Sequence, residues 1–467
     1  MRLHGGLLDA YRDTGVHGAI SVRVDRDRCK LRAMTASVAW PIASANGVRT
    51  YNPAMQTAQS VDVAVVGRGA IGAAVALGCA QAGLKVAWVG PAGAPSTRAS
   101  TGSNQAMFES ATDWDARVYA LSPATRDLLR QLRIWDALPA ARMAPVYDMR
   151  VFGGEHVDAP ELHLDAYSGQ VEALAWILEN RSLMRTLQGA LSFAGVQCVD
   201  DTVQGLEVQG EGESGRIRLS LSAGRELVAR LAIAADGADS SIRAMAGIEA
   251  HVRPYDQRAV VANFDTSLPH ADTAWQWFGP DIGVLALLPL PSPEPARGRA
   301  SMVWSAPQAL ADELMTLAPE ALAERVREAS HGQLGAFSLI TAQQSFPLRL
   351  VRVPRLVAPR LVLAGDAAHA VHPLAGQGMN LGFADVAQIL AVLKGREPHR
   401  DLADPLLWRR YERARREPVA LMQATTDGLQ RLFGPIPQPL AQVRDLGWRA
   451  VARSGWMRRR LVAHAIR

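Results

Sequence analysis

The chain has 467 residues, of which 48% are hydrophobic, and its 50 Lys and Arg residues exceed its 45 Asp and Glu residues by five charges. This length is sufficient for a large core and predicts two or three structural units. The longest apolar stretch, residues 361–393, is broken by Asp366, His369 and Pro373, so the sequence predicts no membrane-spanning helix. The middle of the chain lacks the clusters of basic and aromatic residues that nucleic-acid binding requires.

The three cysteines, Cys29, Cys79 and Cys198, are far apart and form no C-x-x-C motif. This spacing indicates neither a zinc site nor a disulfide framework. We therefore expect no bound metal and a location in the reducing cytoplasm.

The first strong structural pattern begins only at Val61. Residues 1–60 show no sustained periodicity and contain no signal-peptide core. We therefore expect residues 1–60 to form an extension that does not pack against the rest of the chain. The alternatives are that translation starts at Met55 or that this segment is an arm that docks a partner or a lipid.

Residues 61–89 have the pattern of a β-α-β unit. The apolar run Val61–Val66 predicts a buried strand, a helix extends to Ala82, and Lys85–Val89 predicts a second strand. The connecting sequence G-x-G-x-x-G contributes the candidate dinucleotide-binding residues Gly67, Gly69, Ala70, Ile71 and Gly72. Its first glycine allows the turn, the second lets a pyrophosphate approach the backbone, and the third allows close packing of helix on strand.

One part of this dinucleotide fingerprint is missing. An acidic residue is expected to bind the adenosine ribose about 20 residues after the glycines. The second strand instead ends in Gly90-Pro91. We therefore expect the adenosine to be held more weakly or in a different way.

The middle of the chain predicts mixed structure followed by a second sheet. Helical spacing predicts a helix within residues 170–191, and alternating runs predict strands at 216–221 and 227–235. Further strands, expected to form a mostly antiparallel sheet, cover residues 258–264, 273–278, 283–290 and 300–305. Helices follow at 307–329 and a return strand at 345–350.

Three aromatic residues in the second of these strands have two interpretations. Trp275, Trp277 and Phe278 could form the apolar wall of a substrate pocket, or they could be ordinary core aromatics.

The stretch from Leu361 to Gly382 predicts a strand, a loop rich in glycine and proline, and the start of a helix. The first backbone N–H groups of a helix are unpaired and carry the positive end of its dipole. Glycines at 376, 378 and 382 would let a planar anionic ligand lie on the backbone. Asp366, at the carboxyl end of the strand, could accept hydrogen bonds from a sugar-alcohol chain. The alternative is an ordinary tight turn.

The tail from Asp404 onward predicts helices. In residues 448–466, arginines alternate with apolar residues. A basic amphipathic helix of this type suits an anionic membrane surface or a partner protein, and the alternative is a solvated charged face.

The run from His372 to Asp385, HPLAGQGMNLGFAD, resembles the signature of the flavoprotein aromatic hydroxylases of ubiquinone biosynthesis, which are similar to para-hydroxybenzoate hydroxylase. Residues 115–121 (D-x-R-x-x-A-L) and 236–243 resemble two further motifs of this family. The resemblance extends from Val61 to the end of the chain. It implies an α/β fold with a Rossmann-like FAD-binding domain, a second, mostly antiparallel substrate sheet and a helical C-terminal tail.

The resemblance also implies a domain order and a set of FAD contacts. FAD-binding segments are expected at 61–150 and 351–400, mixed segments at 151–235, the substrate domain at 236–350 and C-terminal helices at 401–467. The further implied contacts with FAD are Arg117, Asp236, Gly365, Asp366, Gly376, Gly378, Met379 and Asn380. The alternative for Arg117 is a surface ion pair with Asp113 or Asp115.

The implied reaction is hydroxylation of the aromatic ring of a polyprenyl phenol or quinol. Reduced flavin converts O2 to an electrophile by forming a hydroperoxide on its ring, and the protein contributes position, dryness and electrostatics. Electrons would come from NAD(P)H or a protein donor. A base that deprotonates the phenol would assist the reaction, and His372 and Pro373 are the candidate catalytic residues. We expect His369 to be structural.

Three other functions remain open. Trp275-Gln-Trp277-Phe-Gly-Pro280 partly resembles the W-x-W-x-I-P motif of tryptophan halogenases, but glycine replaces isoleucine. A flavin-binding scaffold for quinone-synthesis enzymes would fit the missing ribose acid and the basic tail. The third is aromatic hydroxylation in another pathway. For the ubiquinone hydroxylase, the expected location is the cytoplasm or the periphery of the inner membrane, and its oligomeric state is left open.

Overall fold

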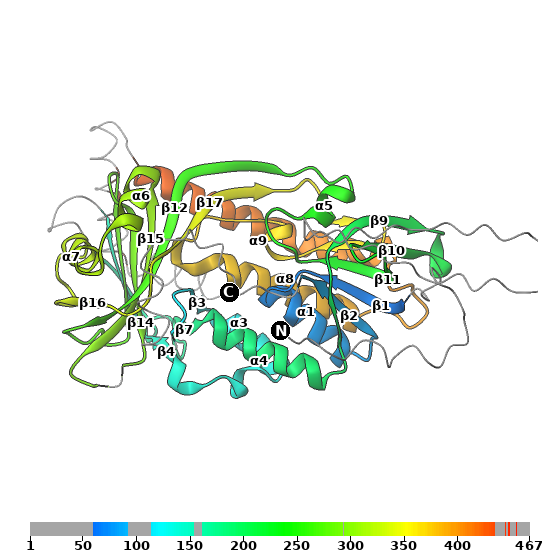
Figure 1. The fold of residues 1–467 in the computed structure, drawn as a ribbon, viewed down its shortest axis with the longest axis horizontal. Helices are drawn as coiled ribbons and strands as arrows, with labels where there is room; N and C mark the ends of the chain where they lie inside the picture. The colour runs from blue at the N-terminus through cyan, green and yellow to red at the C-terminus, as the bar shows by residue number, and fades with distance from the viewer. Residues whose placement is uncertain are drawn as a thin grey trace, which may run out of the picture. The chain divides into compact units, whose positions relative to one another are not determined.

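The computed structural model describes residues 59–91, 114–153, 161–292 and 294–434, together with residues 444, 447, 448 and 454. The predicted extension at 1–60 lies outside these residues apart from its last two, and most of the predicted basic helix at 448–466 also lies outside them. The described residues belong to one compact unit, which begins at Met55. Figure 1 shows its elements.

The first sheet has a parallel centre in the order β19-β11-β1-β2-β8, with β18 antiparallel at one edge. The antiparallel strand β10 pairs with the first half of β11, on the side where β19 pairs with its last residues, and β9 pairs with β10. The bounds are β1 Gln59–Val66, β2 Val86–Gly90, β8 Gln197–Asp200, β9 Val203–Gln209, β10 Arg216–Leu221, β11 Glu226–Ala234, β18 Val357–Ala358 and β19 Leu361–Leu363.

The predicted β-α-β unit is confirmed, with α1 (Ala70–Gln81) between β1 and β2. Nine of the twelve residues of α1 are buried and they are small or apolar, so the helix packs closely on the sheet. Gly67 has φ +120°, and a Cβ there would lie 2.1 Å from the carbonyl oxygen of Ala235. A Cβ on Gly72 would lie 2.1 Å from the carbonyl oxygen of Gly67. The first and third glycines are therefore required by close backbone packing.

The second sheet has the order β16-β12-β15-β14-β13-β5-β6, and β17 pairs with β12. Every pair is antiparallel except β13 with β5. The bounds are β5 Asp148–Gly153, β6 Glu161–Asp165, β12 His251–Thr266, β13 Thr273–Gly279, β14 Gly283–Leu290, β15 Gly298–Pro307, β16 Phe337–Leu339 and β17 Gln344–Arg352. The predicted α/β fold with a second, mostly antiparallel sheet is confirmed.

A small third sheet has the order β3-β7-β4, and its strands lie between β2 and β8 in the sequence. Its strands are β3 Val118–Leu121, β4 Met143–Val146 and β7 Ala175–Glu179. The prediction of one helix within 170–191 is wrong in its first half, because Trp176 belongs to β7 and pairs with Leu121 and Pro145. The helix, α4, runs only from Asn180 to Phe193.

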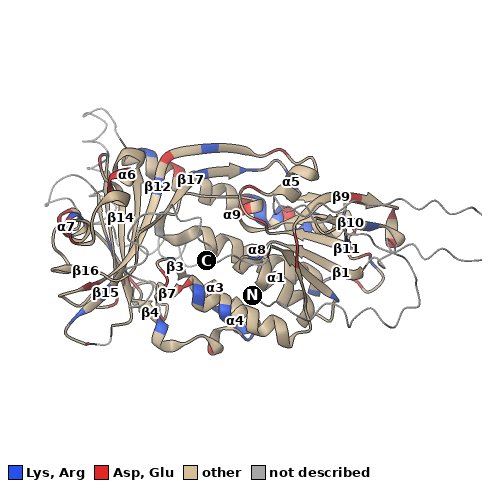
Figure 2. Cartoon of the chain, viewed as in Figure 1, with Lys and Arg blue, Asp and Glu red and all other residues tan. Residues whose placement is uncertain are grey.

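Helices cover the sheets and form the C-terminal part. Their bounds are α3 Pro123–Gln131, α5 Ser241–Met245, α6 Gln308–Thr316, α7 Pro319–Ala329, α8 Gln377–Lys394 and α9 Pro405–Leu432. Helices α6 and α7 pack on one face of the second sheet, in a core that contains Trp277 and Trp304. Across the described residues, none of the helices has both the length and the hydropathy needed to cross a bilayer. In Figure 2 the central strands of the second sheet carry few charged residues.

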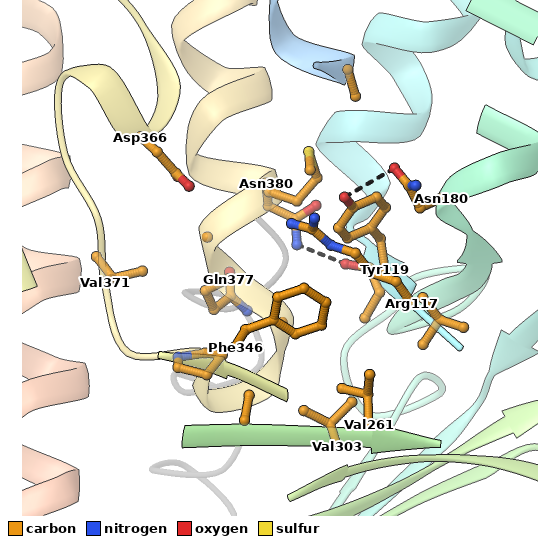
Figure 3. A pocket seen from close by; sticks show the side chains of 18 of the residues that line it. Arg117, Tyr119, Asn180, Val261, Val303, Phe346, Asp366, Val371, Gln377 and Asn380 are labelled. Carbon is orange, nitrogen blue, oxygen red and sulfur yellow. Dashed lines mark hydrogen bonds between the residues drawn. The ribbon is translucent and has the colours of Figure 1, made fainter. Parts of the chain in front are cut away.

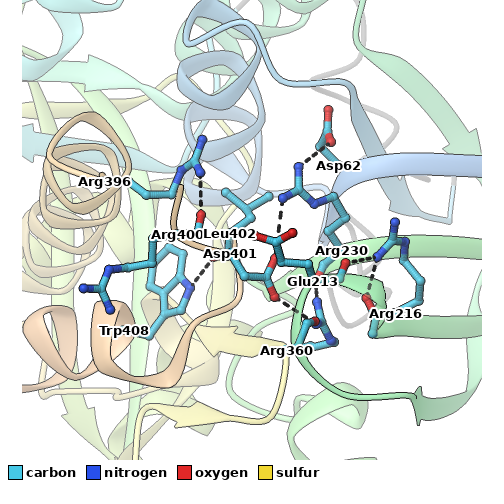
Figure 4. Close-up of polar contacts among 12 residues, drawn as sticks. Asp62, Glu213, Arg216, Arg230, Arg360, Arg396, Arg400, Asp401, Leu402 and Trp408 are labelled. Carbon is cyan, nitrogen blue, oxygen red and sulfur yellow. Dashed lines mark hydrogen bonds and ion pairs between the residues drawn. The ribbon is translucent and has the colours of Figure 1, made fainter. Parts of the chain in front are cut away.

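A buried polar network joins the end of α8 to the first sheet (Figure 4). Arg360, 7% exposed, forms an ion pair with Asp401 at 2.9 Å and donates to the carbonyl oxygens of Arg230 and Gly212. Arg230 contacts Asp401 at 3.5 Å and Asp62 at 3.4 Å. The network therefore fixes the loop that leads into α9 against β1 and β11.

We expect Arg360→Met to lower the free energy of unfolding by about 3 kcal/mol, because it leaves Asp401 buried with a weaker partner. Urea denaturation monitored by circular dichroism measures this change. The matched control is Arg327→Met, because the side chains of Arg327 and its partner Glu324 are 44% and 51% exposed. Its cost should stay below about 1 kcal/mol, and equal losses in the two variants would contradict the analysis.

Candidate functional site

A cavity of about 890 Å³ runs from the first sheet to the second sheet. Its polar half is lined by the loop after β1, by β3 and by the segment from β19 to α8. Its other half is lined by side chains of the second sheet and of β4 and β7 in the third sheet. Figure 3 shows Asp366, Arg117 and Asn180 around the polar half, with Val261 and Val303 on the strands at the opposite end.

The loop between β1 and α1 forms one backbone wall of the polar half. Gly69, Ala70 and Ile71 line the cavity, whereas Gly67 and Gly72 do not. Gly69 is the N-cap of α1 and lacks a side-chain cap. A Cβ on Gly69 would have no neighbouring atom within 4 Å. The helix start is therefore open toward the cavity and can accept an anionic group.

The start of α8 forms the second backbone wall. Gly376, Gly378 and Met379 line the cavity, and Gly376 is the N-cap, in the left-handed conformation with φ +67°. A Cβ on Gly378 would meet only the side chain of Val371, at 3.9 Å. A flat anionic ring can therefore approach the unpaired N–H groups of this helix closely.

A buried carboxylate holds the loop before α8 in place. Asp385, fully buried, accepts hydrogen bonds from the Gly365 N–H at 2.8 Å and from Arg415 Nε at 2.6 Å. His369 Nε2 lies 2.8 Å from the same carboxylate. Burial alone would raise the pKa of Asp385, but the charges and hydrogen bonds of His369 and Arg415 outweigh it and hold the pKa below its usual value. His369 therefore has the structural position expected from the sequence.

Asp366 directs its carboxylate into the cavity (Figure 3). The side chain is open to the cavity. The protein atoms around it still desolvate its carboxyl group, and this desolvation raises the pKa of Asp366. Among the described residues no cation pairs with it directly. The carboxylate is thus free to accept hydrogen bonds from a hydroxyl-bearing ligand.

Arg117 also lines the cavity. Its guanidinium lies 5.4 Å from the ring centroid of Tyr119 and 5.3 Å from that of Phe346. Within the described part of the chain, no carboxylate forms an ion pair with it. Asp115 instead accepts hydrogen bonds from the backbone N–H groups of Arg117 and Arg181, and Asp113 lies outside the described residues.

Two predicted FAD contacts use their side chains within the protein. Asp236 accepts hydrogen bonds from Ser240 Oγ at 2.5 Å and from the Ile242 N–H at 3.2 Å. It therefore holds its own turn, and its neighbours Ala235 and Gly237 line the cavity in its place. Asn380 lines the cavity, but its side chain bonds β3 and α3 at Ala120, Ser122 and Thr125. Its role is to position α8 against these elements.

The assignment of His372 as a catalytic base is corrected by its environment. The ring is fully buried and does not line the cavity, although Val371 and Pro373 on either side do. Its Nε2 lies 2.9 Å from Gln257 Oε1, and the ring packs edge-on against Tyr255. Burial lowers its pKa to about 4. Neutral His372 therefore supports the loop, and its ring does not line the cavity in this structure.

The assignment of Trp275 and Trp277 to a substrate wall is also corrected. Successive residues of a strand point to opposite faces, and these two face α6 and α7, where they stack on Phe152. Phe278 packs with Phe433 in a separate cluster and does not line the cavity either. The residue between the tryptophans, Gln276, lines the cavity, and an expectation based on aromatic content alone could not find it.

The apolar half of the cavity is made instead by aliphatic side chains. They come from the second and third sheets and include Val146, Met149, Leu164, Leu174, Ile177, Val261, Val284, Leu288 and Val303. Sequence analysis missed Tyr119, whereas Glu179-Asn180 resembles a Glu-Asn pair that lies near the cofactor in the hydroxylase family, with an amphipathic helix as the alternative. Tyr119 and Asn180 line the cavity and share a hydrogen bond of 3.2 Å. Both residues lie in segments that the sequence analysis selected, residues 115–121 and 170–191.

The missing acid at the end of β2 is accompanied by a local rearrangement. A Cβ on Gly90 would lie 2.8 Å from Cγ of Arg68. The Arg68 guanidinium lies 4.7 Å from the ring centroid of Trp88 and forms an ion pair with Asp200, the partner of Gly90 in β8. The arginine side chain thus covers the place where the acid is expected.

Comparison with known proteins decides the family. The FAD binding domain family matches residues 60–426. The chain belongs to this FAD-dependent family.

Two relatives illustrate the match, each more than 30% identical to this chain. 3-demethoxyubiquinol 3-hydroxylase of Escherichia coli is 32% identical over 88% of this chain and 99% of its own length. Ubiquinone hydroxylase UbiL of Rhodospirillum rubrum is also 32% identical, over 87% of this chain and 89% of its own length. Both belong to the hydroxylase group whose motif the sequence resembles.

Solved structures share the fold at lower identity. Pseudomonas aeruginosa PqsL in complex with 2-aminobenzoylacetate has a TM-score of 0.66 and 21% identity, covering 84% of this chain and 99% of its own. The R204Q variant of Klebsiella pneumoniae HpxO, complexed with FAD, has a TM-score of 0.63 and 16% identity, covering 86% and 96%.

The polar half of the cavity fits the FAD of this family. Gly69 leaves open space at the start of α1 for a pyrophosphate. The start of α8 presents N–H groups toward a flavin ring, and Asp366 presents a carboxylate for its sugar-alcohol chain. Arg117, without a carboxylate partner in the described residues, faces the same space.

The glycines provide a test of this fit. Gly69→Ala should fold normally, because Gly69 has ordinary extended backbone angles and its Cβ would meet no protein atom. It should raise the FAD dissociation constant by about tenfold or more, equivalent to about 1.4 kcal/mol, because the methyl group occupies the approach to the backbone. Flavin fluorescence titration measures the constant.

The matched control is Gly189→Ala, on an open face of α4 where a Cβ also meets no atom. This change should leave FAD affinity unchanged and stabilise the helix by up to about 1 kcal/mol. Unchanged FAD affinity in Gly69→Ala would contradict the placement of the cofactor.

The low pKa of His372 predicts a loss of stability in mild acid. Its folded pKa of about 4 is below the ordinary value of 6.5, so the unfolded chain takes up the proton first as the pH falls. The contribution is present above pH 6.5 and is lost on acidification toward pH 4, with about 2 kcal/mol lost by pH 5. Urea unfolding at pH 7 and pH 5 should show this extra loss in the native protein but not in His372→Gln. An equal loss in both would show that His372 is not responsible.

Proposed function

We propose that this enzyme hydroxylates the aromatic ring of a polyprenyl-substituted phenol or quinol on the route to ubiquinone, with FAD and O2. The observation that carries the proposal is the continuity of the cavity, which joins a polar half that fits FAD to an apolar half of aliphatic side chains. The relatives from Escherichia coli and Rhodospirillum rubrum, a 3-demethoxyubiquinol 3-hydroxylase and a ubiquinone hydroxylase, support the substrate class.

The chain's own residues contribute binding and orientation. When bound, FAD supplies the activation of O2. The N-termini of α1 and α8 stabilise anionic parts of the cofactor, and Arg117 adds a positive charge on the same side. The Asp385 network holds Gly365 and Asp366 in the geometry that faces the cofactor.

The apolar half of the cavity excludes water from a bound ring and shapes its binding site. Its aliphatic walls bury a ring with an attached lipid tail, which is favourable at about 25 cal/mol for each Å² of apolar surface removed from water. The ionisable residues that line the cavity are Arg68, Asp115, Arg117, Tyr119, Arg181, Arg185, Arg349 and Asp366. None of them belongs to β4 to β7 or to β12 to β15, the strands that supply most of the aliphatic side chains. These strands therefore offer no ionisable side chain to a ring bound against them, and hydrogen-bonding groups are the polar contacts available there.

We also propose that the enzyme takes its lipid-tailed substrate at an anionic membrane surface. Arg409, Arg413 and Arg416 are exposed on the first half of α9, and Leu406 beside them is 57% exposed. Clustered arginines next to an apolar side chain favour anionic lipid headgroups by about 1 kcal/mol for each arginine near the surface.

The function is tested with purified, FAD-loaded protein, a short-chain prenylphenol, labelled dioxygen and either NADH or NADPH. We expect a product that has gained one labelled oxygen on the ring, detected by mass spectrometry. Chemically reduced enzyme mixed with labelled dioxygen provides a second arm that needs no biological electron donor.

The alternatives give different outcomes in the same experiment. A flavin-binding scaffold would bind FAD and give no labelled product in either arm. A hydroxylase of another pathway would oxidise simple phenols and leave the prenylated compound unchanged. A halogenated product that requires added bromide would indicate a halogenase.

A further inference from the structure

The strands of the second sheet that wall the apolar half of the cavity carry two deeply buried polar side chains. Three neighbouring strands present every second residue to the cavity, as the alternation of a strand requires. These residues are Ala274 and Gln276 of β13, Val284, Ala286 and Leu288 of β14, and Val303 and Ser305 of β15. Five are apolar, and Gln276 and Ser305 are the exceptions.

Gln276 is only 4% exposed. Among the described residues, no group forms a hydrogen bond with its side-chain amide, and the side chain faces the cavity. The amide can therefore offer its donor and acceptor groups to a ligand in the cavity. The backbone of β13 does not need them, because the strand is already held by its pairs with β14 and β5.

Ser305 has the same properties on the far side of the wall. It is 3% exposed, lines the cavity, and its hydroxyl bonds no other described residue. Gln276 pairs with Ala286, Ala286 pairs with Val303, and Ser305 follows two residues later on the same face. The Cα atoms of the two polar residues are thus roughly 12 Å apart, from the usual strand spacing and rise. Two polar groups at opposite ends of an apolar patch suit a ring with polar substituents.

We infer that Gln276, with Ser305 as the second contact, is the hydrogen-bonding anchor that recognises a ring oxygen of the aromatic substrate. An amide both donates and accepts, so it can bond a phenol hydroxyl or a quinone oxygen. The bond fixes the rotation of the ring within otherwise featureless aliphatic walls, and so selects the ring carbon presented to the cofactor. This inference deepens the proposed function and rests on it for the class of substrate.

Three variants of the full-length, FAD-loaded enzyme test this assignment. Gln276→Met keeps the length of the side chain and removes its hydrogen-bonding groups. Ser305→Ala removes the second contact. Gln343→Met is the matched control, because the Gln343 amide bonds the carbonyl oxygens of Met315 and Leu317 and does not line the cavity.

Each variant is measured with two ligands, a short-chain prenylphenol and its methyl ether, which lacks the hydroxyl donor. Binding is read from the perturbation of flavin absorbance, and product formation gives kcat/KM. Gln276→Met should weaken phenol binding by about tenfold, with a smaller effect on the ether. FAD content and the melting temperature should not change, because the Gln276 amide bonds no other described residue and faces the cavity.

Ser305→Ala should weaken phenol binding less than Gln276→Met, and Gln343→Met should preserve the preference for phenol over ether. Unchanged phenol binding in Gln276→Met would overturn the assignment. Equal losses for phenol and ether would also overturn it, because the effect would not act through the ring oxygen. Loss of FAD or a lowered melting temperature would assign Gln276 to cofactor binding or to folding.

The two proposals fail in different ways. If the native protein binds the prenylphenol but forms no hydroxylated product, the proposed function fails while the binding comparison still tests Gln276. If it forms the product and Gln276→Met performs equally well, only the anchor is wrong.

Discussion

The arrangement of the site depends on one buried charge, the carboxylate of Asp385. Taking a carboxylate out of water is costly unless charged partners and hydrogen-bond donors surround it. Here the donors come from separate parts of the chain: the Gly365 N–H before α8, His369 in the following loop, and Arg415 in α9. Satisfying this charge therefore requires the loop, α8 and α9 to assemble together, and the same assembly turns Asp366 toward the cavity.

Backbone, more than side chains, makes the polar half of the site. Two helix starts, at Gly69 and at Gly376, face one space, and glycines at both keep that space clear. Fixed amide dipoles need no reorganisation when an anionic ring arrives. This explains why a hydroxylase can function with few ionisable side chains beside its substrate. The chemistry belongs to the cofactor, and the protein contributes placement and exclusion of water.

The sequence predicted local structure well where one rule was sufficient. The β-α-β unit, the strand before Gly365 and the helix after it follow from periodicity and glycine spacing, and the structure contains them. Residue roles were harder to predict because they depend on which way a side chain points. Asp236 satisfies its own turn and His372 points into the core beside Tyr255. Neither direction can be derived from the composition of a motif.

The same limit applies to the substrate wall. Trp275 and Trp277 were considered because of their size, yet the two faces of a strand cannot be assigned until the packing of α6 and α7 is known. Once that packing is known, strand alternation places Gln276 in the cavity. The prediction of a single helix within residues 170–191 was wrong for a related reason. Apolar residues of a short buried strand fit both periods, and pairing with β3 and β4 decided for the strand.

The length of β12 has a mechanical consequence. This strand of 16 residues pairs with β17 from His251 to Val261. His251 follows α5 closely in the sequence, and Val261 lines the apolar half of the cavity. Both strands supply residues to the cavity wall, and Figure 1 shows them crossing the molecule together. The two strands pair on both sides of an irregularity between Pro254 and Arg258. Moving the two ends of the cavity apart would break these pairs, so the paired strands oppose such an opening.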